Sequence, residues 1–147
     1  MPNFERLQQE VLDLGLVDDV VFAGRRPHQE IALWMGASDW LLVSSVREGW
    51  PTVYFEAMAC GRPVLTSNVD CAKQAICQGA YGSVIEPRTP EAFASAIITA
   101  MRMDYQPELI RACAELNSWA RWAEKSMRVF DNVLGIEADS EPAPWCT

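Results

Sequence analysis

The chain has 147 residues, the length of one ordinary domain, and half of them are apolar, so it can form a hydrophobic core and is not disordered over most of its length. Its 20 acidic residues outnumber its 12 Lys and Arg residues, giving a net charge of −8. This balance argues against nonspecific binding to nucleic acid or to a membrane through basic patches. No apolar run approaches the roughly 20 residues of a membrane span, and the start lacks a signal-peptide pattern, so we expect a cytoplasmic protein.

The cysteine and histidine residues indicate neither a disulfide framework nor a metal site. The five cysteines form no Cys-x-x-Cys pair, and we expect reduced thiols that mostly fill the core. The single histidine, His28, has no neighbouring cluster of Cys, His and carboxylate residues at metal-ligand spacing. The sequence therefore predicts no bound metal.

The first part of the chain alternates between helical and strand-like patterns. Apolar residues at helical spacing predict a helix over 4–14, and the apolar run Val20–Ala23 predicts a buried strand. A short helix over 28–36 follows, and Trp40–Val43 reads as a second buried strand. The alternation continues with a helix over 52–60, for which Pro51 suits the first position and Gly61 the C-terminal cap.

The rest of the chain continues the same alternation. The remaining predicted elements are a strand over 62–66, a helix around 71–78, a strand near 83–85, a helix begun by Thr89 and Pro90, and a helical region over 107–134 broken near Asn117-Ser118. Such an order predicts an α/β fold, a Rossmann-like parallel sheet with helices on both faces. We expect one domain over 1–135 and a disordered tail over 136–147. Ligands of such sheets bind at the carboxyl ends of strands, and the loop after Trp40–Val43 is such an end.

This loop and the helix after it carry two carboxylates. Glu48 lies in the loop, and Glu56 lies about 1.5 turns into the helix, roughly 8 Å along its axis. Between them the amides of Thr52, Val53 and Tyr54 are free to face an anion at the helix N-terminus. A carboxylate can accept both hydroxyls of a vicinal diol. The spacing therefore suits a nucleoside-diphosphate sugar, whose ribose, diphosphate and pyranose follow one another.

The segment over 44–64 resembles the signature of the retaining glycosyltransferases of the GT-B fold, the glycosyl transferases group 1 family: Ser-x-x-Glu-Gly-aromatic, five residues, then Glu-Ala-Met-Ala-x-Gly-x-Pro-Val. The resemblance extends over about residues 4–134. It implies that Glu48 is the catalytic residue that touches the transferred sugar, and that Glu56 binds the ribose hydroxyls. It also implies a substrate-binding role for Ser45, Gly49, Trp50, Pro51, Thr52 and Val53. Members of the family typically need no metal or other cofactor, so the helix N-terminus and basic side chains would stabilise the leaving diphosphate.

The sequence departs from the family pattern in two ways. It resembles part of the donor-binding half, without the acceptor half and without two strands whose Arg and Lys normally bind the diphosphate. Residues 68–74 read Asn-Val-Asp-Cys-Ala-Lys-Gln, where the family has Asp-x-Gly-Gly-x-Pro-Glu. We therefore expect the chain alone to be catalytically incompetent, and a partner chain or a homo-oligomer to complete it. With two strands absent, Val20–Ala23 is predicted to pair with Trp40–Val43 or with another copy.

Two other functions remain open at this point. One is a nucleotide-sugar epimerase on the same fold, for which the sequence offers no acid/base pair beside the sugar. The other is a binding or assembly module that has lost catalysis. Calorimetry with nucleotide sugars would separate these alternatives from a transferase.

Overall fold

The computed structural model describes residues 2–76 and 81–135, and the chain divides into two compact units, 1–31 and 32–147. The predicted tail over 136–147, and the end of the helix predicted around 71–78, lie outside the described residues. Helix α2 (His28–Ala37) runs through the boundary between the units. Within the described ranges, no helix is both long and apolar enough to cross a membrane.

The first unit contains a helix, a segment without regular secondary structure and the start of α2, and here the sequence prediction is partly wrong. Helix α1 (Pro2–Asp13) forms as expected, and Gly15 follows it with a φ of +68°, a conformation that glycine adopts without strain. Val20–Ala23 forms no strand in the structure, and Val21 is 78% exposed. Phe22 instead packs edge-on against Phe4, with ring centroids 5.3 Å apart. A short apolar run becomes a strand only where a neighbouring strand takes its hydrogen bonds, and the run alone does not specify that neighbour, so the predicted strand is wrong.

The second unit is built around a parallel sheet, as predicted. Its strands are β1 (Leu41–Val43), β2 (Val64–Ser67) and β3 (Gly82–Ile85), in the order β1-β2-β3. Leu41 lies opposite Val64 in the first pair, and Val64 lies opposite Gly82 in the second. All four residues of β2 are buried, as a central strand covered on both faces requires. The carboxyl ends of the three strands therefore meet at one edge of the sheet.

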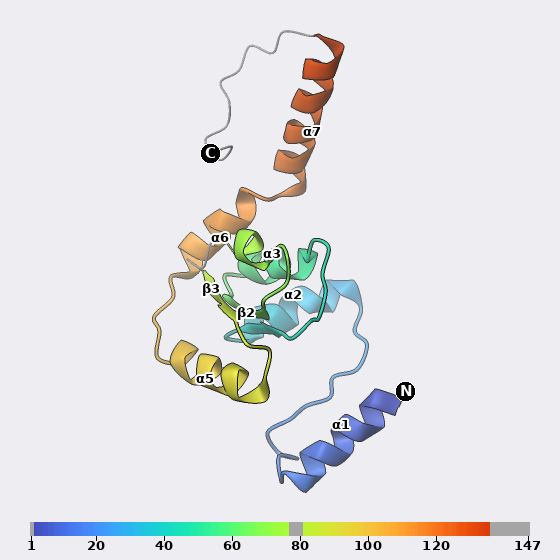
Figure 1. Ribbon diagram of the computed structural model, residues 1–147, viewed down its shortest axis with the longest axis vertical. Helices are drawn as coiled ribbons and strands as arrows, with labels where there is room; N and C mark the ends of the chain where they lie inside the picture. Colours follow the sequence, from blue (N-terminus) through green and yellow to red (C-terminus); the bar gives the residue numbers. More distant parts are fainter. Residues whose placement is uncertain (1, 77–80, 136–147) are drawn as a thin grey trace. The chain divides into compact units, whose positions relative to one another are not determined.

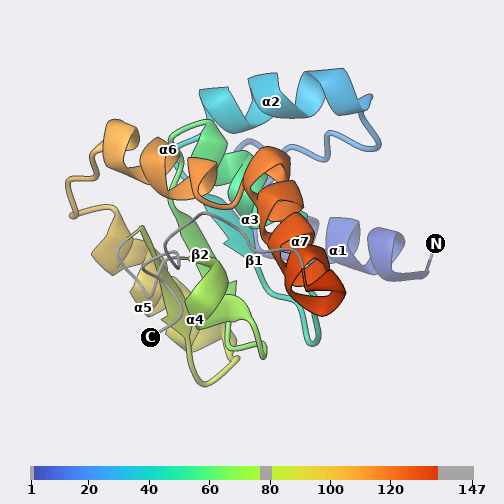
Figure 2. The ribbon, with the colours of Figure 1, turned by 90° about the horizontal axis from the view of Figure 1, so that it is seen from above.

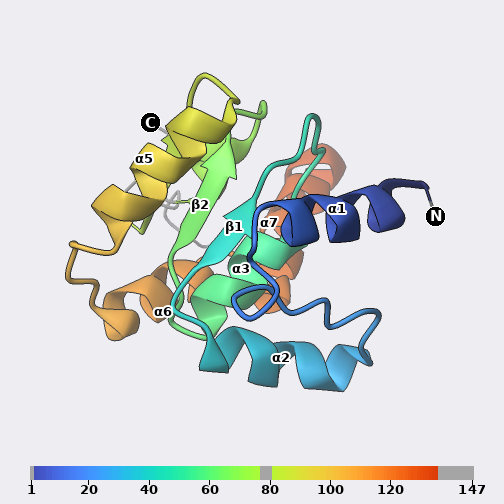
Figure 3. The same cartoon turned by 90° about the horizontal axis from the view of Figure 1, so that it is seen from below.

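Helices cover both faces of this sheet. The remaining helices are α3 (Thr52–Ala59), α4 (Ala72–Ala75), α5 (Pro90–Ala100), α6 (Pro107–Glu115) and α7 (Trp119–Leu134). Helix α5 lies on one side of the strands, while α3 and α6 lie on the other (Figures 1 and 3). The α/β class with helices on both faces is thus confirmed.

Each face has its own packing. On the α5 side, Leu65 and Ile85 are buried together with Ala100, and Phe93 and Ile97 pack against them. On the opposite side, α3 and α6 run next to each other (Figure 2). A side chain at Gly61, which has a φ of +73°, would place its Cβ 2.9 Å from that of Pro107, so glycine permits this close approach of α6.

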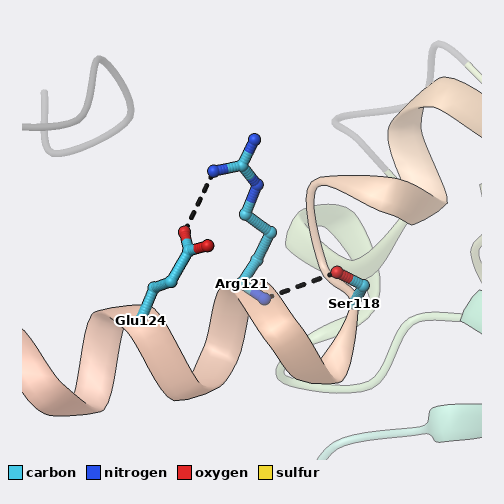
Figure 4. A network of polar contacts seen from close by, with 3 residues as sticks. All are labelled: Ser118, Arg121 and Glu124. Atoms are coloured by element: carbon cyan, nitrogen blue, oxygen red, sulfur yellow. Dashed lines mark hydrogen bonds and ion pairs between the residues drawn. The ribbon is translucent and has the colours of Figure 1, made fainter.

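Hydroxyl caps define two helix starts that the sequence predicted. Thr89 accepts a hydrogen bond from the Ala92 amide at 3.3 Å, and Pro90 begins α5. Ser118 accepts from the Arg121 amide at 3.4 Å, which separates α6 from α7 (Figure 4). The Arg121 guanidinium then pairs with Glu124 at 3.0 Å along the exposed helix. No residue of α7 is buried, although its apolar residues share one side.

Three cysteines of the described residues can be compared with the prediction of reduced thiols. Cys60 and Cys71 are free, as expected. The prediction is wrong at Cys113, which is disulfide-bonded. Cysteine spacing alone could not indicate this bond, because a disulfide depends on how the folded backbone places the two sulfurs.

Candidate functional site

The loop after β1 carries the first of the two carboxylates in a fixed position. The Ser45 hydroxyl donates a hydrogen bond of 2.6 Å to Oε1 of Glu48, and both residues are half-buried. A hydroxyl-to-carboxylate bond of this length is charge-assisted and stronger than a neutral one. The second carboxylate oxygen, Oε2, receives no hydrogen bond from the residues that the structure describes. Glu48 therefore has acceptor capacity left for a ligand.

Segments that follow the other two strands also contact this loop. The Ser67 hydroxyl, at the end of β2, donates to the Ser45 carbonyl oxygen. The Cys71 thiol reaches the Glu48 carbonyl oxygen at 3.9 Å. Arg88, shortly after β3, donates from Nη1 to the Ser44 carbonyl oxygen at 3.3 Å. The carboxyl ends of all three strands thus converge on the loop that carries Glu48, as parallel topology predicts.

Two protonated groups lie close to this carboxylate. Burial raises the pKa of the Tyr54 phenol, which also shares a hydrogen bond with Thr66 and feels the negative charge of Glu48. Burial likewise raises the pKa of the Cys71 thiol, with smaller contributions from the charges of Glu48 and Asp70. Both groups are therefore neutral near pH 7. Cys71 is consequently not an activated nucleophile, because that role requires a lowered pKa.

Pro51 is placed one position away from the prediction. It is the N-cap of α3, with φ −80° and ψ 93°, rather than the first helical residue, and it is buried. The Tyr54 amide donates to the Pro51 carbonyl oxygen at 3.1 Å, so the prediction of three free amides is wrong for Tyr54. The amides of Thr52 and Val53 remain as the donors that point out of the helix end.

The second carboxylate, Glu56, lies in the middle of α3. It is partly exposed, although Ala57 and Met58 beside it are fully buried. Within the described parts of the chain, its side chain has no hydrogen bond or ion pair, and no hydrogen bond joins it to Glu48. Glu48 thus precedes the start of α3 and Glu56 follows it in the chain, and no hydrogen bond between described residues links the two carboxylates.

The two other predicted residues lie on the exposed side of the loop. Gly49 is exposed. Trp50 is 51% exposed and stacks on Phe55, with ring centroids 5.4 Å apart and an interplanar angle of 24°. Trp50 is therefore held against α3 by one face while the rest of its ring meets solvent.

Sequence reasoning missed Ser67 and Arg88. Both follow strands whose carboxyl ends reach the site, and a search for polar residues at every such end would have included them. Residues of the loop after β1 were found because that loop alone carries the recognisable motif.

A parallel sheet covered on both faces, with polar residues gathered at the carboxyl ends of its strands, is the architecture of Rossmann-like ligand-binding domains. Residues 1–118 match the family described as glycosyl transferases group 1, and the chain belongs to that family. The family and the GT-B-type fold predicted from the sequence are thereby confirmed.

Similar proteins agree with this assignment. The chain is 27% identical over 136 residues to a D-inositol 3-phosphate glycosyltransferase of Acidothermus cellulolyticus, covering 92% of this chain and 30% of that protein. A protein of the same name from Frankia alni is 32% identical over 130 residues, covering 86% of this chain and 32% of that protein. The solved structure of a sucrose-phosphate synthase from Thermosynechococcus elongatus superposes with a TM-score of 0.71 at 25% identity, covering 90% of this chain and 35% of that one. The chain thus spans about a third of the length of these proteins.

Proposed function

We propose that this chain is the donor-binding part of a retaining glycosyltransferase, which recognises a nucleoside-diphosphate sugar for hexosyl transfer. The observation that carries the proposal is Glu56, a partly exposed carboxylate without a described partner in an otherwise apolar helix. Because leaving a charge partly desolvated and unpaired is costly, a ligand that hydrogen-bonds to it explains its position. Membership of the glycosyl transferases group 1 family supports the same conclusion.

Each part of the donor has a partner in this proposal. Glu56 accepts hydrogen bonds from the two ribose hydroxyls, which suit the two oxygens of a carboxylate. The diphosphate lies at the N-terminus of α3, where the Thr52 and Val53 amides and the positive end of the helix dipole favour an anion. Glu48 accepts hydrogen bonds from hydroxyls of the transferred sugar through its free oxygen and is the catalytic residue.

The leaving group is stabilised by the protein without a metal ion. When the glycosidic bond to the diphosphate breaks, negative charge grows on the leaving phosphate oxygen. Fixed amides at the end of α3 stabilise that charge without reorganising during the reaction. Arg88, which already contacts the loop at Ser44, adds a positive charge nearby. Ser45, Gly49, Trp50 and Pro51 shape the loop around the sugar and the phosphates.

Transfer also needs an acceptor site, which we assign to polypeptide outside this chain. The chain spans about a third of the length of the proteins that it matches. A further segment of the same polypeptide, a separate partner chain or a second copy would supply the acceptor-binding part. The chain alone is therefore expected to release nucleoside diphosphate from nucleotide sugars no faster than buffer does. Turnover by the purified chain would contradict this assignment.

A non-catalytic binding or assembly module is the second candidate. The observation in its favour is Cys71, which stands where the family has a glycine and packs its side chain beside the Glu48 carbonyl oxygen. A side chain at that position takes up space that a glycine would leave to a ligand. Absence of binding at millimolar nucleotide sugar would favour this candidate.

Isothermal titration calorimetry with UDP, GDP and their glucose and mannose conjugates tests the proposal. The unmodified chain should bind one nucleotide series, and Glu56→Ala should abolish that binding. Glu115→Ala, which removes an exposed carboxylate from α6, is the matched control and should bind like the unmodified chain. Binding that survives Glu56→Ala would overturn the proposed role of this residue.

A further inference from the structure

We propose that Ser67 is a positioning residue for Glu48, acting through Ser45. This inference rests on the proposed function, because it assumes that Glu48 contacts the transferred sugar. Two successive hydrogen bonds lead from the end of the central strand β2 to the carboxylate of Glu48. Ser67 donates to the Ser45 carbonyl oxygen, and the Ser45 hydroxyl donates to Oε1 of Glu48 at 2.6 Å.

The first residue of this chain of contacts is rigidly held. Ser67 is fully buried and is the last residue of β2, where it lies opposite Ile85 of the neighbouring strand. Its backbone is therefore fixed by the sheet. Because the side chain is buried, water cannot replace the Ser45 carbonyl oxygen as the hydrogen-bond partner of its hydroxyl. A buried hydroxyl bonded to a carbonyl oxygen cannot be removed without leaving that oxygen short of a partner.

The second residue transmits this position to the carboxylate. Ser45 lies two residues beyond the end of β1, so the sheet itself no longer fixes its peptide group. The bond from Ser67 replaces a sheet hydrogen bond at that point and sets the direction in which the Ser45 side chain leaves the backbone. Because Ser45 and Glu48 are only three residues apart, a shift of the Ser45 peptide moves both ends of their hydrogen bond.

Thr66 provides a matched control on the same strand. It is also a fully buried hydroxyl residue, but its side chain bonds to Tyr54 of α3 and to the carbonyl oxygen of Ser67 instead of the loop. A substitution at Thr66 therefore tests the cost of losing a buried hydroxyl from β2, while the contacts of Glu48 with Ser45 are retained. Any effect common to both substitutions is an effect on the fold alone.

The distinguishing measurement compares affinity for a nucleotide with affinity for the corresponding nucleotide sugar. Calorimetry is done with UDP, UDP-glucose, GDP and GDP-mannose. Ser67→Ala is expected to weaken nucleotide-sugar binding about threefold to tenfold, the range for one lost hydrogen bond, while nucleotide affinity stays within about twofold. Ser67→Thr, which keeps the hydroxyl, should restore part of the loss. Ser45→Ala should reproduce the same split, and Thr66→Val should leave the ratio of the two affinities unchanged.

Three results would overturn the inference. Ser67→Ala could leave both affinities unchanged, or it could weaken both equally, which is the result for a purely structural residue. Ser67→Ala combined with Glu48→Gln could weaken nucleotide-sugar binding further than Glu48→Gln alone, which would show that Ser67 does not act through Glu48. If Ser67→Ala fails to fold, Ser67→Cys, which keeps a side chain of similar shape but replaces the hydroxyl with a weak thiol donor, decides by the same criteria. Failure of the unmodified chain to bind any probe would instead refute the proposed function, and the inference with it.

Discussion

Arg88 donates a hydrogen bond from its guanidinium to the carbonyl oxygen of Ser44 at 3.3 Å, which joins the segment after β3 to the loop after β1. The two residues are 44 positions apart in the sequence, and only the parallel order of the strands brings them together. This contact places a positive charge beside the loop that leads to the N-terminus of α3. It therefore suggests a role for Arg88 in holding the diphosphate.

Arg88→Gln should weaken UDP or GDP binding about fivefold at low ionic strength, since it removes one charge near the diphosphate. The loss should shrink in about 0.5 M salt, because Arg88 is exposed and its field is screened there. Arg102→Gln, which removes an exposed arginine beyond α5, is the matched control. Calorimetry in which Arg88→Gln binds the nucleotide as tightly as the unmodified chain would contradict this role.

Gly82 lies where β3 approaches β2 most closely. A Cβ at this position would lie 2.1 Å from the carbonyl oxygen of Val64, a backbone atom that cannot move without disturbing the sheet. Gly82→Ala should therefore lower the free energy of unfolding by about 2 kcal/mol or more. Gly36→Ala in helix α2 meets no atom within 4 Å and should instead raise it by up to about 1 kcal/mol. Urea unfolding that gives both variants the same sign would contradict the register of β2 and β3.

Several apolar side chains of α6 are buried, whereas those of α7 are exposed or only partly buried. Truncating them should therefore lower the free energy of unfolding by different amounts. Ile110 of α6 is fully buried, so Ile110→Ala should cost roughly 2–5 kcal/mol of stability. Phe130 of α7 is 58% exposed, so Phe130→Ala should change stability by no more than about 0.5 kcal/mol. Thermal and urea unfolding of the isolated chain would measure both. An equally large loss at Phe130 would mean that the apolar side of α7 is covered in solution.

Stability should fall at alkaline pH. Burial raises the pKa of Tyr54 above 10.0 and that of Cys71 above 9.0, so both groups ionise more readily in the unfolded chain. The stabilisation from each group is complete below its unfolded pKa and is lost as the pH rises through the folded one. The free energy of unfolding should therefore decline from about pH 9 upward. Cys71→Ala should reduce this decline; a pH profile of stability that Cys71→Ala leaves unchanged would contradict the assignment to Cys71.

The sequence predicted the second unit well, since its elements are fixed by local signals. Thr89 and Pro90 start α5, and a break at Asn117-Ser118 separates two helices, as their capping chemistry indicated. Val20–Ala23 has the composition of a strand but forms no regular secondary structure. Strand formation depends on a pairing partner, which an apolar run of four residues does not specify.

In the site too, local sequence signals could be recognised, whereas contacts between distant segments could not. The two carboxylates and the loop between them were predicted from the motif that this segment shares with the glycosyl transferases group 1 family, since their spacing alone is a weak signal. The positions of Ser67 and Arg88 after strand ends could be read from the sequence, but their contacts with the loop after β1 could not, because these depend on how three separate strands end at one edge. The cap position of Pro51 was misjudged by one residue, since a proline suits both the N-cap and the first turn of a helix.

The central claim is that a nucleotide sugar binds across the N-terminus of α3, between Glu48 and Glu56. The most direct measurement is a titration of the isotope-labelled chain with UDP-glucose or GDP-mannose, followed by the backbone amide resonances. The largest shifts are expected at Thr52 and Val53, with smaller ones at Ser45 and Glu56. Shifts concentrated away from residues 44–56, or no shifts at millimolar ligand, would contradict the claim.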